Sequence, residues 1–227
     1  MGSVTVFGLP ASTDVARVLA CLFEKDVEFQ LVRIDTYKGN QKVPEFLKLQ
    51  DCSGQVTFKD GNTTLTNSRE ICRCVCTEYA DSGNKNIFGT GALERASIEQ
   101  WLQAETQNFD PPSSDLVFQL AFAAPLGSIP DQTIIANSEK KLAKLFDVYD
   151  KRLAESEFLA GDEFTIADLS HLPNSQYIVT KSEKGRELFK KRKNVDRWWN
   201  AISSRASWKK VVEMQQEHPG LLEKFTY

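Results

Sequence analysis

Two serine residues stand where the chain is expected to enter a helix, a position from which a hydroxyl group can serve an anion. Ser12 precedes, and Ser68 begins, a stretch with apolar residues at helical spacing. The unpaired N–H groups and partial positive charge of a helix N-terminus favour a nearby anion, and a serine hydroxyl can donate a hydrogen bond to it. Taken alone, such a serine more often only caps the helix.

Three cysteines at alternate positions, Cys72, Cys74 and Cys76, have a poor spacing for a metal site. On a helix the first and last share a face, and Cys74 lies on another. The chain has no C-x-x-C pair, and His171 is far away in sequence. We therefore predict no metal and expect these cysteines to be small buried hydrophobic residues.

The elements that must position these residues alternate between strand and helix over the first eighty residues. Residues 4–7 form a short β-branched run, and the helical stretch after Ser12 follows it. Residues 28–34 then alternate with period two, which predicts a second strand parallel to the first in a right-handed βαβ unit.

A hairpin and a helix are predicted to complete this first domain. A short helical piece near residues 44–47 precedes two runs, 55–59 and 63–66, and Asp60-Gly61 between them suits a tight turn. Residues 68–79 read as one more helix. The order β-α-β-(α)-β-β-α is that of a thioredoxin-like domain.

The remainder of the chain is predicted to be all-helical. The polar stretch 81–86 has the composition of a linker, so we predict a first domain over 1–82, a linker over 83–90 and a helical domain over 91–227. Within the last, Thr165 and Asp168 have the spacing of a capping box at a helix start.

Composition and charge narrow the classes of partner. The 28 Lys and Arg against 31 Asp and Glu give a net charge of −3, which offers no global field for nucleic acid or an anionic membrane. Neither a secretory signal nor a membrane-length apolar window is apparent. Five cysteines, an odd number, favour reduced thiols, so we expect a cytosolic protein.

The domain order and three motifs together resemble the cytosolic glutathione transferases, in particular the plant phi class. The motifs are residues 6–18, the run Ser68-Arg69-Glu70-Ile71, and residues 167–173. The resemblance covers nearly the whole chain. It implies an α/β thioredoxin-like domain that binds glutathione, followed by an all-α domain that contributes the site for a hydrophobic substrate.

The serine of the first motif is catalytic in that family, and it matches Ser12. A serine hydroxyl cannot act as a base near neutral pH, so its implied role is to donate a hydrogen bond to the glutathione sulfur and favour the anion. A hydrogen bond to a charged group contributes about 1.5–3 kcal/mol, which lowers the thiol pKa by roughly one to two units.

Two departures from the family motif concern the ends of glutathione. The family holds the glycine carboxylate with a His-Lys pair, and here Gln41 and Lys42 stand in that place. The γ-glutamyl end is held by a Glu-Ser pair, which here is Asn67-Ser68, so one negative charge is missing. Asn67 with Glu70 three residues on also forms the pattern of a helix capping box, the interpretation that we favour for Asn67. The two roles do not exclude each other, so Asn67 and Ser68 are both predicted glutathione contacts.

A third departure precedes the hairpin, where family members carry a cis-proline after Gln-Val or Gln-Ile. Here Gln55, Val56 and Thr57 contain no proline, and either Val56 or Thr57 aligns with it. A cis peptide bond before a residue other than proline costs about 2.5–4 kcal/mol. The peptide bond at this position is therefore either trans, with a rearranged loop, or a strained cis bond. Gln55 and Val56 remain predicted glutathione contacts.

The resemblance also implies a hydrophobic-substrate pocket, with Leu9, Phe118 and Phe122 as candidate lining residues. The spacing of the two phenylalanines is more often that of core residues. The leading hypothesis is a homodimeric enzyme that joins the glutathione thiolate to an apolar electrophile, with a hydroperoxide as another acceptor. The alternative is a non-catalytic carrier of apolar small molecules such as flavonoids.

Overall fold

The computed structural model describes residues 4–34 and 56–217, which divide into two compact units. Among the described residues, the first unit holds those up to Lys85 together with those from Ala206 onward, and the second unit runs over Asn86–Arg205. The change of unit after Lys85 lies inside the predicted linker. The chain from Ala206 onward, predicted as part of the helical domain, belongs instead to the first unit.

A four-stranded sheet of order β2-β1-β3-β4 forms the base of the first unit. Its strands are β1 (Val4–Phe7), β2 (Phe29–Val32), β3 (Thr57–Asp60) and β4 (Thr63–Leu65). β1 and β2 are parallel, whereas β3 runs antiparallel to both β1 and β4. The predicted βαβ unit and hairpin are confirmed, and the helix predicted near 44–47 lies outside the described residues.

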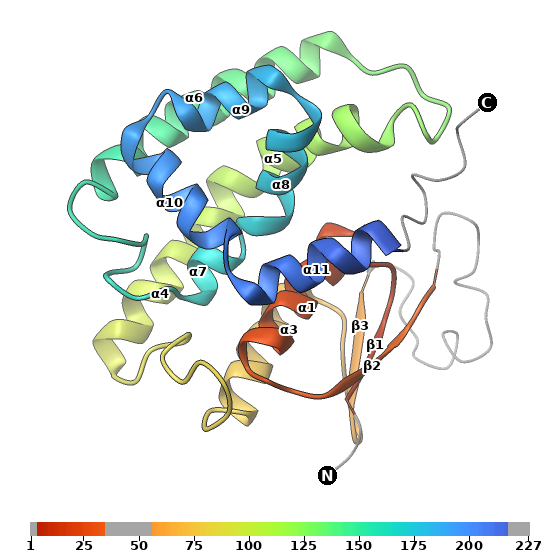
Figure 1. Cartoon of the computed structure of the whole chain (residues 1–227), viewed down its shortest axis with the longest axis vertical. Coiled ribbons are helices and arrows are strands. Elements are labelled where there is room, and N and C mark those ends of the chain that lie inside the picture. The colour runs from red at the N-terminus through yellow and green to blue at the C-terminus, as the bar shows by residue number, and fades with distance from the viewer. Residues whose placement is uncertain (1–3, 35–55, 218–227) are drawn as a thin grey trace. The chain divides into compact units, whose positions relative to one another are not determined.

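Helices α1 (Thr13–Glu24), α3 (Ser68–Glu78) and α11 (Ala206–Glu217) lie together beside this sheet (Figure 1). α1 and α3 bury the apolar faces that the spacing predicted, with Val15, Leu19 and Ile71 fully enclosed. α11 packs on α1 with Trp208 and Val211 buried, and its Ser207 donates a hydrogen bond to Glu24 at the end of α1. The sequence predicted only that the whole region beyond residue 91 is helical, which does not reveal the unit against which α11 packs.

The second unit is helical, as predicted, with no strand among its described residues. Two π-helical segments, η3 (Glu105–Phe109) and η4 (Phe118–Phe122), continue the helices α4 (Ala92–Ala104) and α5 (Asp110–Val117) respectively. None of the described helices is long and apolar enough to cross a membrane. The elements are α4 (Ala92–Ala104), η3 (Glu105–Phe109), α5 (Asp110–Val117), η4 (Phe118–Phe122), α6 (Gln132–Arg152), α7 (Ile166–Leu169), α8 (Leu172–Lys181), α9 (Glu183–Lys190) and α10 (Lys193–Ser203).

His171 lies in the core of this unit and has a structural role. Its Nδ1 is 2.8 Å from the Ala167 carbonyl oxygen, which can only accept, so Nδ1 carries the proton. Nε2 therefore accepts the hydroxyl of Tyr149, 3.0 Å away. Burial raises the pKa of Tyr149, which keeps that hydroxyl protonated.

The predicted capping box at Thr165 and Asp168 is present at the start of α7. The fully buried Asp168 carboxylate accepts the N–H groups of Thr165 and Leu159, both at 3.0 Å, and the indole N–H of Trp198 at 2.8 Å. Burial raises the pKa of this carboxyl group, while those hydrogen bonds oppose the rise. One side chain thus holds a helix start, a loop and α10 together.

We expect Asp168→Ala to lower the free energy of unfolding by about 3 kcal/mol, because three buried N–H groups and the Thr165 hydroxyl lose their acceptor. Denaturant unfolding measures the effect. Glu163→Ala, an exposed carboxylate in the preceding loop, is the matched control and should change stability by less than about 0.5 kcal/mol. Equal, small effects of both substitutions would contradict the role given to Asp168.

Candidate active site

The turn that follows β1 places Ser12 at the start of α1. The Ser12 N–H donates to the Leu9 carbonyl at 2.9 Å, and the Ser12 carbonyl accepts the Ala16 N–H at 2.9 Å. The residue is 8% exposed, and its side chain makes no capping hydrogen bond to the first turn. The capping role that the local pattern favours is therefore not observed, and the hydroxyl stands at the positive end of the helix.

The loop ahead of Ser12 is tied to the last helix of the same unit. The side-chain amide of Gln215, in α11, donates to the Pro10 carbonyl at 2.8 Å. Because proline also restricts its own backbone, this bond helps to fix the turn that carries the serine. Sequence analysis missed Gln215, since nothing local distinguishes it from other polar residues of α11.

Ser68 is bound to α1 by a network across the two helices. Its hydroxyl donates to Asp14 Oδ1 at 2.6 Å and accepts from Arg17 Nη1 at 2.7 Å. Arg17 also pairs with Asp14 at 2.8 Å, and its side chain is only 1% exposed. Sequence analysis gave neither charged residue a role, although an arginine within the otherwise apolar stretch 15–19 was a usable signal.

Asn67 caps α3, as its helix-cap interpretation predicts. Its side-chain oxygen accepts the N–H groups of Arg69 and Glu70 at 3.0 and 3.2 Å. The reciprocal half of the predicted box is not formed within the described residues, because the Glu70 carboxylate pairs with Arg73 at 3.0 Å instead.

Three predicted glutathione contacts, Gln41, Lys42 and Gln55, lie outside the described residues, so they stay predictions. Val56 is described and buried. No cis peptide bond occurs in the described parts of the chain, so the bond between Val56 and Thr57 is trans. If Thr57 is the residue that aligns with the proline, the peptide bond before it is therefore trans. If Val56 aligns with the proline, the bond in question precedes Val56 and lies outside the described residues.

The candidate residues of the hydrophobic-substrate pocket fall in different units. Leu9 is partly buried in the first unit, and both phenylalanines lie in η4 of the second. Phe122 packs edge-to-face on Tyr177 with ring centres 5.3 Å apart, whereas Phe118 is 41% exposed. Phe122 is therefore a core residue, and Phe118 has the exposure that contact with a ligand requires.

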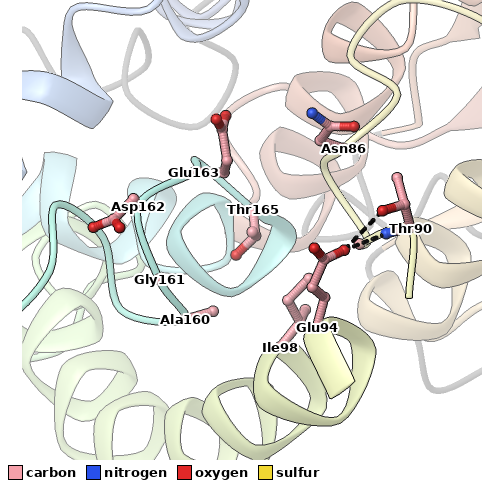
Figure 2. Close-up of a pocket in the computed structure, with 10 residues that line it drawn as sticks. Asn86, Thr90, Glu94, Ile98, Ala160, Gly161, Asp162, Glu163 and Thr165 are labelled. Carbon is pink, nitrogen blue, oxygen red and sulfur yellow. Dashed lines mark hydrogen bonds between the residues drawn. The ribbon is translucent and has the colours of Figure 1, made fainter. Parts of the chain in front are cut away.

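A pocket of about 190 Å³ inside the second unit contains none of the predicted site residues (Figure 2). Glu94 on its wall accepts the N–H groups of Thr90 and Gly91 at 2.7 and 3.1 Å. These two hydrogen bonds hold the pKa of Glu94 below its usual range, and the bond from the Thr90 N–H contributes most. Figure 2 shows Asp162 and Glu163 pointing away from Glu94, so the acidic groups do not converge.

Two of the three cysteines of α3, Cys72 and Cys76, are buried as predicted, whereas Cys74 is only partly buried. Cys72 and Cys76 are buried against Cys21 of α1, with the Sγ atoms of Cys21 and Cys76 3.7 Å apart. Hydrogen bonding with Cys72 and Cys76, together with burial, raises the pKa of Cys21, which suppresses thiolate formation. The described residues contain no group of three or more side chains able to hold a metal ion.

Comparison with known proteins agrees with this architecture. The protein-family model "Glutathione S-transferase, N-terminal domain" matches residues 2–75 of the chain. A second family model, "Glutathione S-transferase, C-terminal domain", matches residues 111–206. The chain is 37% identical to glutathione S-transferase F11 of Arabidopsis thaliana over 93% of this chain and 98% of that protein. The chain therefore belongs to the glutathione S-transferase family.

The relatives also agree with the phi-class resemblance. Glutathione S-transferase F10 of Arabidopsis thaliana is 39% identical over 89% of this chain and 93% of that protein. The crystal structure of glutathione transferase F2 from Populus trichocarpa is 54% identical, with a TM-score of 0.90 over 94% of this chain and 99% of that one. Class F is the phi class, so the chain is a phi-type glutathione transferase.

We expect Asn67→Ala to lower the free energy of unfolding by about 1 kcal/mol, because two N–H groups of α3 lose their acceptor. Asn67→Asp keeps an acceptor in place and serves as the control, with stability close to that of the wild type. Thermal and denaturant unfolding measure both variants. An alanine variant as stable as the aspartate variant would show that the cap does not matter.

Proposed function

We propose that this glutathione transferase uses Ser12 as its catalytic residue to stabilise the glutathione thiolate. The observation that carries the proposal is the position of Ser12 at the N-terminus of α1, with a side chain that does not cap the helix. A donor in this place combines a charge-assisted hydrogen bond with the helix dipole, and both favour the anion over the thiol. Because the chain belongs to the glutathione S-transferase family, we take the thiol substrate to be glutathione.

The proposed reaction is a nucleophilic attack by that thiolate. Glutathione loses its thiol proton to solvent, and the sulfur lone pair forms a bond to an electrophilic carbon of an apolar acceptor. When the acceptor is an aryl halide, the halide leaves with the electron pair of its bond to carbon. Ser12 keeps its own proton throughout, because its role is to donate a hydrogen bond.

The remaining contacts of glutathione are proposed from the family motif and the described geometry. Ser68 and the start of α3 suit the γ-glutamyl end, because the N-terminus of a helix favours a carboxylate. Gln41 and Lys42 are proposed for the glycine carboxylate, and the backbone at Gln55 and Val56 for the cysteine moiety. Leu9 and Phe118 are proposed contacts of the apolar acceptor.

Replacement of Ser12 by alanine tests the catalytic role. We expect kcat/KM for glutathione and a chromogenic aryl halide to fall by about 10- to 100-fold near neutral pH, since one hydrogen bond to the sulfur anion is lost. Calorimetry should show that the variant still binds glutathione, because the other contacts remain.

Thr13→Ala removes a neighbouring hydroxyl from the same turn and is the matched control, with activity near that of the wild type. Normal glutathione binding with activity unchanged in Ser12→Ala would refute the catalytic assignment. A wild-type chain that binds no glutathione, but binds a flavonoid tightly, would favour the carrier.

We propose further that the protein acts in the cytoplasm as a homodimer, the assembly that its family resemblance implies. Sedimentation equilibrium should then give twice the 25.6 kDa mass of the chain at micromolar concentration. A mass equal to that of one chain across the concentration range would contradict the dimer.

A further inference from the structure

The buried interface between α1 and α3 brings two thiol groups into direct contact. The Sγ atoms of Cys21 in α1 and Cys76 in α3 are 3.7 Å apart, although the two residues are separated by 55 positions in the sequence. A disulfide bond has an S–S distance of about 2.05 Å. The two sulfur atoms therefore need to approach each other by less than about 2 Å, a shift that rotation about the side-chain bonds can supply.

The other two cysteines of α3 are less suited to this bond. Cys72 also borders Cys21, but its thiol donates to the Arg17 carbonyl oxygen at 3.8 Å. Cys74 is two residues from both Cys72 and Cys76, so it lies on a different face of the helix, and it is only partly buried. Cys21 and Cys76 are thus the pair whose sulfur atoms the structure places against each other.

The two thiols of the pair differ in their access to solvent. Cys76 is 5% exposed, whereas Cys21 is fully buried. Hydrogen bonding with Cys72 and Cys76, together with burial, raises the pKa of Cys21, so its thiol is a poor first nucleophile. A small local opening of α3 exposes Cys76 before Cys21. An oxidant therefore reacts with Cys76 first, and Cys21 is the second thiol to react.

We propose that Cys21 and Cys76 form a reversible disulfide bond that joins α1 to α3 when the protein reacts with an organic hydroperoxide. The Cys76 sulfur attacks the terminal oxygen of the peroxide and the O–O bond breaks. The alcohol leaves with the thiol proton, and Cys76 becomes a sulfenic acid. The Cys21 sulfur then attacks the Cys76 sulfur, and the sulfenic hydroxyl leaves with the Cys21 proton as water. The two thiols lose two electrons, which the hydroperoxide gains.

The disulfide bond stabilises an arrangement of helices that already exists. α1 and α3 pack on each other in the first unit, and the new bond closes a loop of 55 residues between them. A bond across a loop of this length restricts the unfolded chain more than the folded one. Oxidation by a hydroperoxide therefore raises the stability of the unit that carries Ser12. This role goes beyond the proposed function and does not depend on it.

Treatment of the reduced full-length chain with cumene hydroperoxide tests the proposal. The remaining thiols are alkylated in denaturant, and the protein is digested and analysed by mass spectrometry. We expect a peptide pair joined through Cys21 and Cys76, two hydrogen atoms lighter than its parts, which dithiothreitol separates again. The oxidised protein should unfold about 5–10 °C above the reduced protein. Oxidation of Cys76 to a sulfinic or sulfonic acid, without any crosslink, would overturn the proposal.

Two alanine variants separate this pair from the other cysteines. Cys76→Ala should abolish both the crosslink and the rise in unfolding temperature. Cys74→Ala removes the partly buried thiol two residues away and is the matched control, which should keep both. Thermal unfolding in dithiothreitol shows whether each variant is folded, and the wild-type crosslink is decisive even if Cys76→Ala folds poorly. A crosslink from Cys21 to Cys72 or Cys74, or one that leaves the unfolding temperature unchanged, would contradict the proposal.

Discussion

The entry of the chain into α1 is the constraint on which the rest of the site depends. The Ser12 backbone closes the turn through Leu9 and opens the helix through Ala16, so the residue cannot move without loss of both bonds. The Ser12 side chain makes no capping hydrogen bond to the first turn of α1. A helix start with a hydroxyl group beside it brings positive potential and a hydrogen-bond donor to one point, and both favour a sulfur anion. Gln215 adds a third restraint through Pro10.

The first turns of α1 and α3 are joined to each other by a buried polar network. Asp14, Arg17 and Ser68 join helices whose residues lie 51 or more positions apart in sequence, and the buried guanidinium makes that joint costly to disturb. The cysteine contacts between α1 and α3 add apolar packing beneath it. The buried faces of α1 and α3 thus supply rigidity to the helix start that carries Ser12.

Much of this organisation follows from local pattern. Alternation predicted the strands, helical spacing predicted α1 and α3, and the spacing of Thr165 and Asp168 predicted a capping box. These three predictions are confirmed because each depends only on residues that are close together in the sequence. The Asp14–Arg17–Ser68 network and the attachment of α11 to the first unit were not predictable in this way, because both depend on which distant helix a face meets. The partner of Asp168, Trp198, was hidden for the same reason.

The most direct test of the central claim is an ultraviolet titration of glutathione bound to the protein, followed by the absorption of its thiolate. The account predicts that the bound thiol titrates roughly one to two units below the value of about 8.5 for a free cysteine thiol, and that Ser12→Ala moves it back toward that value. A bound thiol that titrates like the free one, or identically in both proteins, would contradict stabilisation of the anion by Ser12.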